Sequence, residues 1–327
     1  MFDIITIGGA TRDVFFKTNE GKIISDKNIP SGRMLGFEYG AKIVPDDTYF
    51  SYGGGGMNTA VSFAKLGLKV AAKVNIGSEG TGSLIHKILK EKKVNTGLVA
   101  RDKNLHTALS IIISDDGDRT MFLYRGANDN LEIKNWSVLK NTGWLYISSL
   151  TGNSENILGK IPDFVLKNKI KLAWNPGSLQ LERGYNYMKK LLKTSSILIL
   201  NEAEAKELLQ SKNRNIKTSD SILLAEIKKM GPEIVVVTKG GKGSYATDGN
   251  QNYREKALSA KVMETTGAGD AYGSTFVAGI IMGRGISEAM KLAAKNAASV
   301  VSKVGAQEGL LTIRELKSKN EKRKIKV

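Results

Sequence analysis

Short apolar runs rich in β-branched residues alternate along this chain with amphipathic helical segments. This order is typical of an α/β fold with a mainly parallel sheet, because parallel strands are joined by crossing helices. The strands that we expect lie at 4–7, 69–74, 144–147, 171–174, 197–200 and 234–238. The helices that we expect lie near 57–66, 80–92, 154–168, 185–193, 202–210, 219–230, 270–282 and 287–303.

Two segments, 11–50 and 105–125, interrupt the alternation. Each has the pattern of a β-hairpin, and in the second an acidic turn at 115–118 separates two apolar arms. We expect them to form a small β-sheet lid inserted in the core. The first segment carries aromatic side chains at Phe15, Phe16, Phe37, Tyr39, Tyr49 and Phe50. These would pack on the lid's own face, stack on a substrate or join two subunits, so a homodimer through the lid is one expectation.

The composition limits the kinds of site that the chain can build. With 327 residues, 41% of them hydrophobic, it can bury a large core, and we predict a single domain over 1–327. The sequence has no cysteine and only two histidines, His86 and His106, so neither a thiolate site nor a histidine-built metal site is expected. The start MFDIITIGGA has no basic segment, and no apolar run reaches the ~18 residues of a membrane span. We therefore expect a cytoplasmic protein without a membrane partner.

The formal net charge of +17 would suit a nucleic-acid-binding protein. However, residues 314–327 hold seven Lys or Arg against two Glu, so five of these net charges belong to a basic tail that we expect to be solvated. Elsewhere lysines predominate, without the interleaved arginine and aromatic residues typical of base recognition. We therefore expect no specific nucleic-acid partner, and the charge would instead attract anionic nucleotides.

The stretch METTGAGDAYGSTFVAG, at 263–279, places a carboxylate directly behind three small residues. Apolar residues then recur at helical spacing, so we predict that a loop feeds a helix at Gly267. Such a junction presents free backbone N–H groups and the positive end of the helix dipole, which favour an anion. Asp270 could then take a proton from an alcohol while the amides hold a phosphoryl group. The alternative is that Thr266 or Asp270 merely caps the helix.

Two glycine-rich segments do not fit the common nucleotide-binding fingerprints. GGGGMN at 53–58 has Asn58 where a dinucleotide fingerprint needs glycine, and GGKGS at 240–244 lacks the pattern of a P-loop. Taken alone, GGGGMN is equally compatible with a tight helix entry.

Several motifs nevertheless occur in one order: GGATRD at 8–13, GGGGMN at 53–58, RGAN at 125–128, NEAE at 201–204, TKGGKG at 238–243 and TTGAGD at 265–270. With these motifs the chain resembles the ribokinase-like (PfkB) carbohydrate kinase family over residues 1–312. The resemblance implies a ribokinase-like three-layer α/β/α core with a mainly parallel sheet and a small β-sheet lid. It also implies ATP with Mg²⁺ as phosphoryl donor, and an alcohol on a sugar or nucleoside as acceptor.

The resemblance further implies roles for single residues. The catalytic base is matched by Asp270, and the anion hole by the amides of Gly267, Ala268 and Gly269. The residues that bind the acceptor are matched by Asp13, Gly54 and Asn58. The residues that bind the nucleotide and its metal are matched by Asn201, Glu204, Thr238, Gly240, Gly243 and Asn296. Glu204 would hold Mg²⁺ through water, although NxxE is also the pattern of a helix capping box.

The chain departs from the family pattern at Glu264, where the motif usually has Asp. In the family this carboxylate helps to hold a monovalent cation such as K⁺, together with carbonyls from the segment that matches 300–309. Because the side chain of Glu is longer than that of Asp, the sequence does not decide whether a monovalent cation activates this protein. The segment SSLTG at 148–152, which lacks an acidic residue, and the long spacing from Asp13 to Gly53 leave the choice of sugar open.

We therefore predict an ATP-dependent sugar kinase that phosphorylates a hydroxymethyl group on a small ribose- or fructose-like sugar. The alternative on the same fold is a nucleoside kinase with an adenosine-like acceptor. A nucleotide- or sugar-binding regulator without catalysis is a further alternative, which the intact motifs at 201–204 and 267–270 disfavour.

Overall fold

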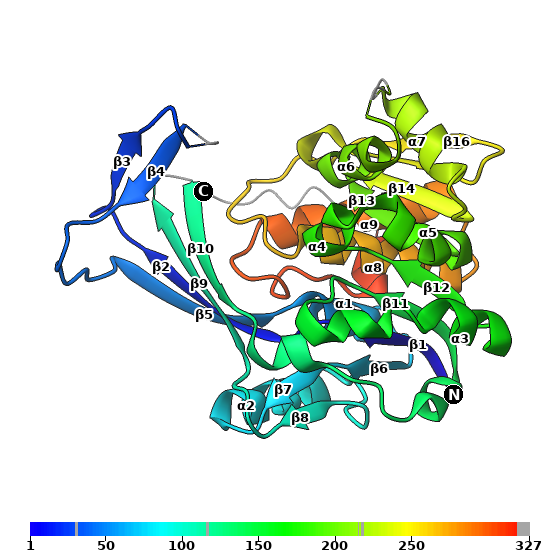
Figure 1. Cartoon of the computed structure of the whole chain (residues 1–327), viewed down its shortest axis with the longest axis horizontal. Helices are drawn as coiled ribbons and strands as arrows, with labels where there is room; N and C mark the ends of the chain where they lie inside the picture. Colours follow the sequence, from blue (N-terminus) through cyan, green and yellow to red (C-terminus); the bar gives the residue numbers. More distant parts are fainter. Residues whose placement is uncertain (30–31, 116–117, 215, 217–218, 319–327) are drawn as a thin grey trace.

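The computed structural model of the chain describes residues 1–29, 32–115, 118–214, 216 and 219–318. Its large sheet has the strand order β16-β15-β14-β13-β12-β11-β1-β6 (Figure 1). The neighbouring parallel strands are β1 (Phe2–Ile7), β6 (Val70–Lys73), β11 (Thr142–Ile147), β12 (Lys171–Trp174), β13 (Ile197–Asn201) and β14 (Ile234–Thr238). The antiparallel strands β15 (Ser244–Thr247) and β16 (Asn252–Glu255) extend one edge. The predicted α/β fold with a mainly parallel sheet is thus confirmed.

Helices cover both faces of this sheet and create two apolar cores. The first core contains residues of α1 (Gly55–Lys65), α2 (Gly80–Glu91), α8 (Ala268–Ile281) and α9 (Ile286–Val301). The second contains residues of α3 (Ile161–Asn168), α4 (Ser178–Glu182), α5 (Gly184–Thr194), α6 (Glu202–Lys212) and α7 (Asp220–Lys228). Successive strand residues point to opposite faces, so Ile4 enters the first core and Ile5 the second. The result is a three-layer α/β/α core.

A separate four-stranded sheet, which we call the lid sheet, projects from the core in the order β10-β9-β2-β5 (Figure 1). Its strands are β2 (Thr11–Lys17), β5 (Asp47–Gly53), β9 (Ala108–Asp115) and β10 (Asp118–Tyr124). Strand β2 begins soon after β1 ends, and β5 leads directly into α1. The lid sheet therefore meets the core at the carboxyl end of β1. Beside the core lies a short parallel pair, β7 (Asn75–Gly77) and β8 (Ala100–Asp102).

The structure differs from the expected elements in three places. Residues 11–50 do not form one hairpin, because β2 pairs with β5 while β3 (Lys22–Ser25) and β4 (Arg33–Gly36) form a hairpin inserted between them. The β15–β16 hairpin was not predicted, since these strands are short and β16 is polar. Residues 314–317, which were expected in the basic tail, belong to α10 (Ile313–Lys317), where Leu316 is buried.

The predicted acidic turn at 115–118 contains residues 116–117, and the predicted tail contains 319–327, which lie outside the described residues. Within the described ranges, no helix has the length and apolarity needed to cross a membrane.

Candidate active site

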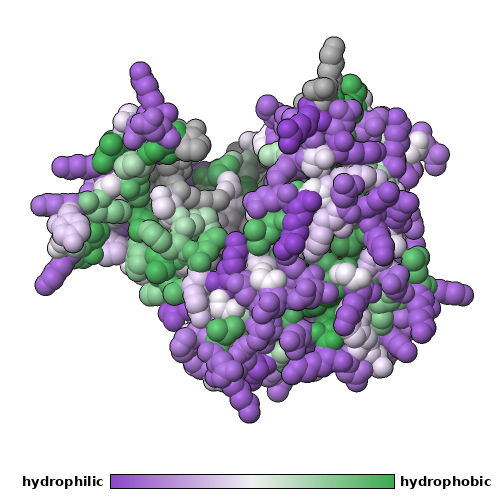
Figure 2. Space-filling view, in the orientation of Figure 1, coloured by the Kyte–Doolittle hydropathy of each residue, from purple (hydrophilic) through white to green (hydrophobic). Residues whose placement is uncertain are grey.

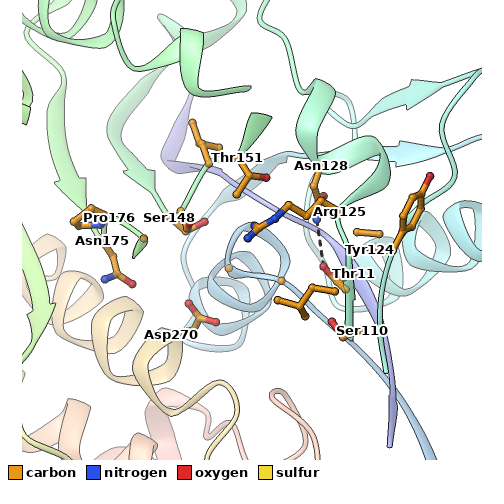
Figure 3. Close-up of a pocket in the computed structure, with 18 of the residues that line it drawn as sticks. Thr11, Ser110, Tyr124, Arg125, Asn128, Ser148, Thr151, Asn175, Pro176 and Asp270 are labelled. Atoms are coloured by element: carbon orange, nitrogen blue, oxygen red, sulfur yellow. Dashed lines mark hydrogen bonds between the residues drawn. The ribbon is translucent and has the colours of Figure 1, made fainter. Parts of the chain in front are cut away.

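A cavity of about 360 Å³ lies where the carboxyl ends of the parallel strands meet the lid sheet. Its polar lining side chains are Thr11, Ser110, Tyr124, Arg125, Asn128, Ser148, Ser149, Thr151, Asn175, Glu204 and Asp270. Figure 3 shows that the labelled side chains approach the cavity from the lid strands, from the segment after β10, from the loops after β11 and β12, and from α8. A cavity of this size with many hydroxyl and amide groups suits a small hydroxylated ligand.

Helix α8 begins at this cavity with a turn that requires glycine. Gly267 precedes the helix with φ of 79°, and a Cβ there would lie 2.5 Å from the Cβ of Ala306. A Cβ added at Gly269, in contrast, would meet no atom within 4 Å, so the space beside the first turn is open. The amide of Ala268 donates to the carbonyl oxygen of Thr265 at 3.3 Å, whereas a helix leaves its following first-turn amides without an intrahelical acceptor. The turn can therefore hold an anion in the open space.

Asp270 lies in this first turn and lines the cavity. Nδ2 of Asn58 donates to its Oδ2 at 2.8 Å, and in the described part of the chain no hydrogen bond reaches its Oδ1. Burial raises the pKa of Asp270, and the hydrogen bond from Asn58 opposes that rise. A carboxylate with a raised pKa and an available oxygen is suited to accept a proton near neutral pH.

Asp13 of lid strand β2 and Asn58 of α1 lie close together. A Cβ added at Gly53 would be 2.5 Å from Oδ2 of Asp13 and 3.6 Å from Oδ1 of Asn58, so both side chains lie against the same glycine. Burial raises the pKa of Asp13 to about 6, opposed by its hydrogen bond with Ser110. The structure thus brings Asp13, Asn58 and Asp270 close together, and their expected roles as acceptor site and base stay predictions.

Gly54 and Gly55 let the start of α1 approach both the sheet and the base. Gly54 has φ of 90°, and a Cβ there would lie 2.6 Å from the carbonyl oxygen of Gly9. A Cβ at Gly55 would lie 2.7 Å from the Cβ of Ser148 and 3.6 Å from Oδ1 of Asp270. Both glycines line the cavity, so larger residues would displace the helix or fill the space.

Asn201 and Glu204 form a reciprocal capping box at the start of α6. The amide of Glu204 donates to Oδ1 of Asn201 at 2.9 Å, and the amide of Asn201 donates to Oε2 of Glu204 at 2.8 Å. Glu204 nevertheless lines the cavity, and burial raises its pKa. The Glu204 side chain therefore caps α6 and also lines the cavity.

The TKGGKG segment forms a turn after β14 and does not line the 360 Å³ cavity. Thr238 ends β14, and a Cβ at Gly240 would meet no atom within 4 Å. Gly243 has φ of 97° and packs against β16, where a Cβ would lie 2.1 Å from the carbonyl oxygen of Glu255. Nζ of Lys239 anchors the turn through ion pairs of 2.6 Å to Asp220 and 3.4 Å to Glu202.

Asn296 is fully buried in α9 and does not line the cavity. Its Nδ2 donates to Oγ1 of Thr275 at 2.7 Å, and its Oδ1 accepts from the amide of Leu311 at 2.8 Å. Its side chain therefore ties α8, α9 and the C-terminal loop together. Its amide is used within the protein, and its expected contact with the nucleotide stays a prediction.

Glu264 joins two loops beside the start of α8. Its Oε1 accepts from the amide of Thr266 at 3.1 Å, and its Oε2 accepts from the amide of Gly305 at 3.2 Å. The carboxylate thus connects the TTGAGD segment with the 300–309 segment, whose carbonyls the family resemblance associates with a cation.

Three residues at or beside the site carried no role in the sequence analysis. The guanidinium of Arg125 points into the cavity (Figure 3), and within the described ranges it makes no hydrogen bond or ion pair. Asn128 accepts from the amide of Ala10 at 2.9 Å and donates to Oγ1 of Thr11 at 3.3 Å, which fixes the start of β2. Gln307 donates to Oδ1 of Asn58 at 3.0 Å. The RGAN motif indicated the first two, whereas no motif included Gln307.

An α/β core with a lid sheet, a glycine-initiated helix and a buried carboxylate in a polar cavity is the architecture of a small-molecule kinase. The family model of the pfkB family carbohydrate kinases matches residues 27–313, so the chain belongs to the PfkB family. It is therefore a sugar or nucleoside kinase, an ATP-dependent phosphotransferase with an alcohol group as acceptor.

Similarity to individual proteins agrees with this assignment. An Archaeoglobus fulgidus protein described as an uncharacterized sugar kinase is 28% identical over 259 residues, which cover 76% of this chain and 98% of that protein. The structure of Arabidopsis thaliana ribokinase complexed with ribose and ATP superposes with a TM-score of 0.79 at 22% identity, over 96% of this chain and 97% of that one. A Methanocaldococcus jannaschii nucleoside kinase superposes with a TM-score of 0.74 at 23% identity, over 96% of each chain. The structural matches confirm the ribokinase-like fold.

Proposed function

We propose that this kinase phosphorylates a hydroxymethyl group on a small sugar, ribose- or fructose-like, with Asp270 as general base. The observation that supports this most strongly is the position of Asp270 in the first turn of α8, with Oδ2 held by Asn58 and with open space beside Gly269. The acceptor oxygen attacks the γ-phosphorus of ATP, its proton passes to Asp270, and ADP leaves. The amides of Gly267, Ala268 and Gly269 stabilise the transferring phosphoryl group.

The acceptor would bind between the lid sheet and the core. Asp13 and Asn58, which lie against Gly53, supply groups for its hydroxyls. Gly54, which lines the cavity, gives it room beside the start of α1. Closure of the lid sheet would exclude water, which otherwise competes as acceptor. The nucleotide would extend from the α8 turn toward Thr238, Gly240 and Gly243, where the backbone is open at Gly240.

Two metal ions are part of this proposal. Asn201 and Glu204 fit a water-mediated Mg²⁺ site, because Glu204 faces the polar cavity while its capping bond uses Oε2. Bound there, Mg²⁺ would offset charge on the ATP phosphates. Glu264 fits a monovalent cation such as K⁺ through its position between the 265–270 and 300–309 segments, whose backbone carbonyls are suitable ligands.

A nucleoside such as adenosine is the alternative acceptor, and the similarity to a nucleoside kinase fold supports keeping it. Purified protein is assayed with MgATP and one acceptor at a time. The sugars are ribose and fructose, the nucleosides are adenosine, inosine and cytidine, and ADP should form with at least one of the two groups. If the sugars are turned over at lower acceptor concentration than the nucleosides, the result supports a sugar as acceptor. Turnover with nucleosides alone would replace the sugar by a nucleoside.

We also propose that the lid sheet joins two copies of the chain. Figure 2 shows hydrophobic side chains gathered over the lid, and the strand register places Phe50 and Phe122, which are 52% and 59% exposed, on one face of the lid sheet. The edge strands β5 and β10 offer unpaired backbone groups to a second copy. Sedimentation should give a dimer that Phe122→Ser converts to monomer, and a monomeric wild-type protein at high concentration would contradict this proposal.

A further inference from the structure

Gln307 lies between α9 and α10 and connects three parts of the site. Its Nε2 donates to Oδ1 of Asn58 at 3.0 Å and to the carbonyl oxygen of Tyr52 at 3.0 Å. Tyr52 belongs to lid strand β5, and Asn58 belongs to α1. One side-chain amide therefore contacts both the lid sheet and the residue that contacts Asp270.

The bond from Gln307 determines which end of the Asn58 amide faces the base. An amide donates through nitrogen and accepts through oxygen, so an Oδ1 held by Gln307 leaves Nδ2 to donate to Asp270. A reversed Asn58 amide would turn its oxygen toward the carboxylate of Asp270 and lose both hydrogen bonds. Gln307 and Asp270 thus favour the same orientation of Asn58.

The segment that carries Gln307 is itself anchored. The amide of Gly305 donates to Oε2 of Glu264 at 3.2 Å, and Gly305 has φ of 91°. A Cβ at Gly305 would lie 3.4 Å from the Cβ of Ser51, so the turn packs against β5. Gln307 therefore projects from a fixed backbone.

We propose that Gln307 is a positioning residue, which holds Asn58 so that its amide hydrogen stays on Asp270 and links this pair to lid strand β5. The inference rests on the proposed role of Asp270 as general base. Gln307 acts through Asn58 and touches neither the substrate nor the phosphate.

The test compares Gln307→Met, which keeps the side-chain length without donors, with wild type. Loss of one neutral hydrogen bond should lower kcat by about three- to tenfold. The acid limb of the kcat–pH profile should move to higher pH, because Asp270 loses a fixed donor that favours its ionised form. KM for ATP should stay unchanged. Gln307→Glu, which offers an acceptor in place of the donor, should lower kcat further above neutral pH. The variant Gln251→Met, at an exposed position outside the site, serves as the matched control.

A double-mutant cycle separates the positioning role from a general effect on the loop or lid. In an Asn58→Ala background, Gln307→Met should have little further effect on kcat. An equal loss in both backgrounds, or an unchanged kcat and pH profile in Gln307→Met, would overturn this inference while an inactive Asp270→Asn still supports the base. Near-normal turnover in Asp270→Asn would overturn the proposed base and this inference with it.

Discussion

Asn58 and Asp270 are 212 positions apart in the chain, yet Nδ2 of Asn58 donates to Oδ2 of Asp270 at 2.8 Å. The contact joins the first turn of α1 to the first turn of α8 across the end of the sheet. The sequence motifs associated Asn58 with the acceptor, and the structure adds a direct contact with the carboxylate that we propose as base. One side chain can thus orient the acceptor and the base together.

The pKa of Asp13 leads to a prediction about stability. Burial raises this pKa from 3.8 to about 6, so the folded protein binds the proton more tightly than the unfolded chain. The associated stabilisation is complete below about pH 4 and is lost as the pH rises through about 6. Asp13→Asn should therefore increase the free energy of unfolding at pH 7 by up to about 3 kcal/mol, with little change near pH 4. Urea unfolding at both pH values tests this, and a parallel pH dependence of wild type and variant would refute it.

Replacement of Gly267 by alanine should destabilise the protein more than the same replacement at Gly283, which has a similar backbone conformation. Gly267→Ala combines φ of 79° with a contact of 2.5 Å to Ala306, whereas Gly283→Ala combines φ of 75° with open space. We expect about 1–2 kcal/mol of destabilisation at Gly283 from backbone strain, and about 1–3 kcal/mol more at Gly267 from overpacking. Thermal unfolding of the two variants gives the difference, and equal losses would show that the turn relaxes around the new methyl group.

The dependence of turnover on monovalent cations tests the proposed role of Glu264 in holding such a cation. Its carboxylate connects the 265–270 segment to Gly305, so a cation held there would steady the amides at the start of α8. We expect higher turnover in K⁺ than in a large organic cation, and a smaller ratio in Glu264→Gln. Equal wild-type rates in sodium, potassium and the organic cation would exclude activation at this position.

The parallel strands, the flanking helices and the turn before Asp270 could be predicted from the sequence. Each of them depends on the spacing of apolar and small residues that are neighbours in the chain. Gln307 was missed because its partner Asn58 lies 249 positions away and the surrounding GAQEG segment has no periodicity. The contact between Asn296 and α8 was not predicted for a similar reason, since this partner depends on how two helices pack. The pairing of β2 with β5 likewise skips an inserted hairpin.

The most direct test of the account is acceptor-dependent ADP formation by wild type and Asp270→Asn, with the exposed variant Asp163→Asn as control. We expect wild type and the control to turn over at least one sugar or nucleoside at similar rates. Asp270→Asn should lose at least ~10²-fold in turnover, as is typical when a general base is removed, while it still binds ATP. Near-normal turnover by Asp270→Asn would contradict the assignment of Asp270 as the base.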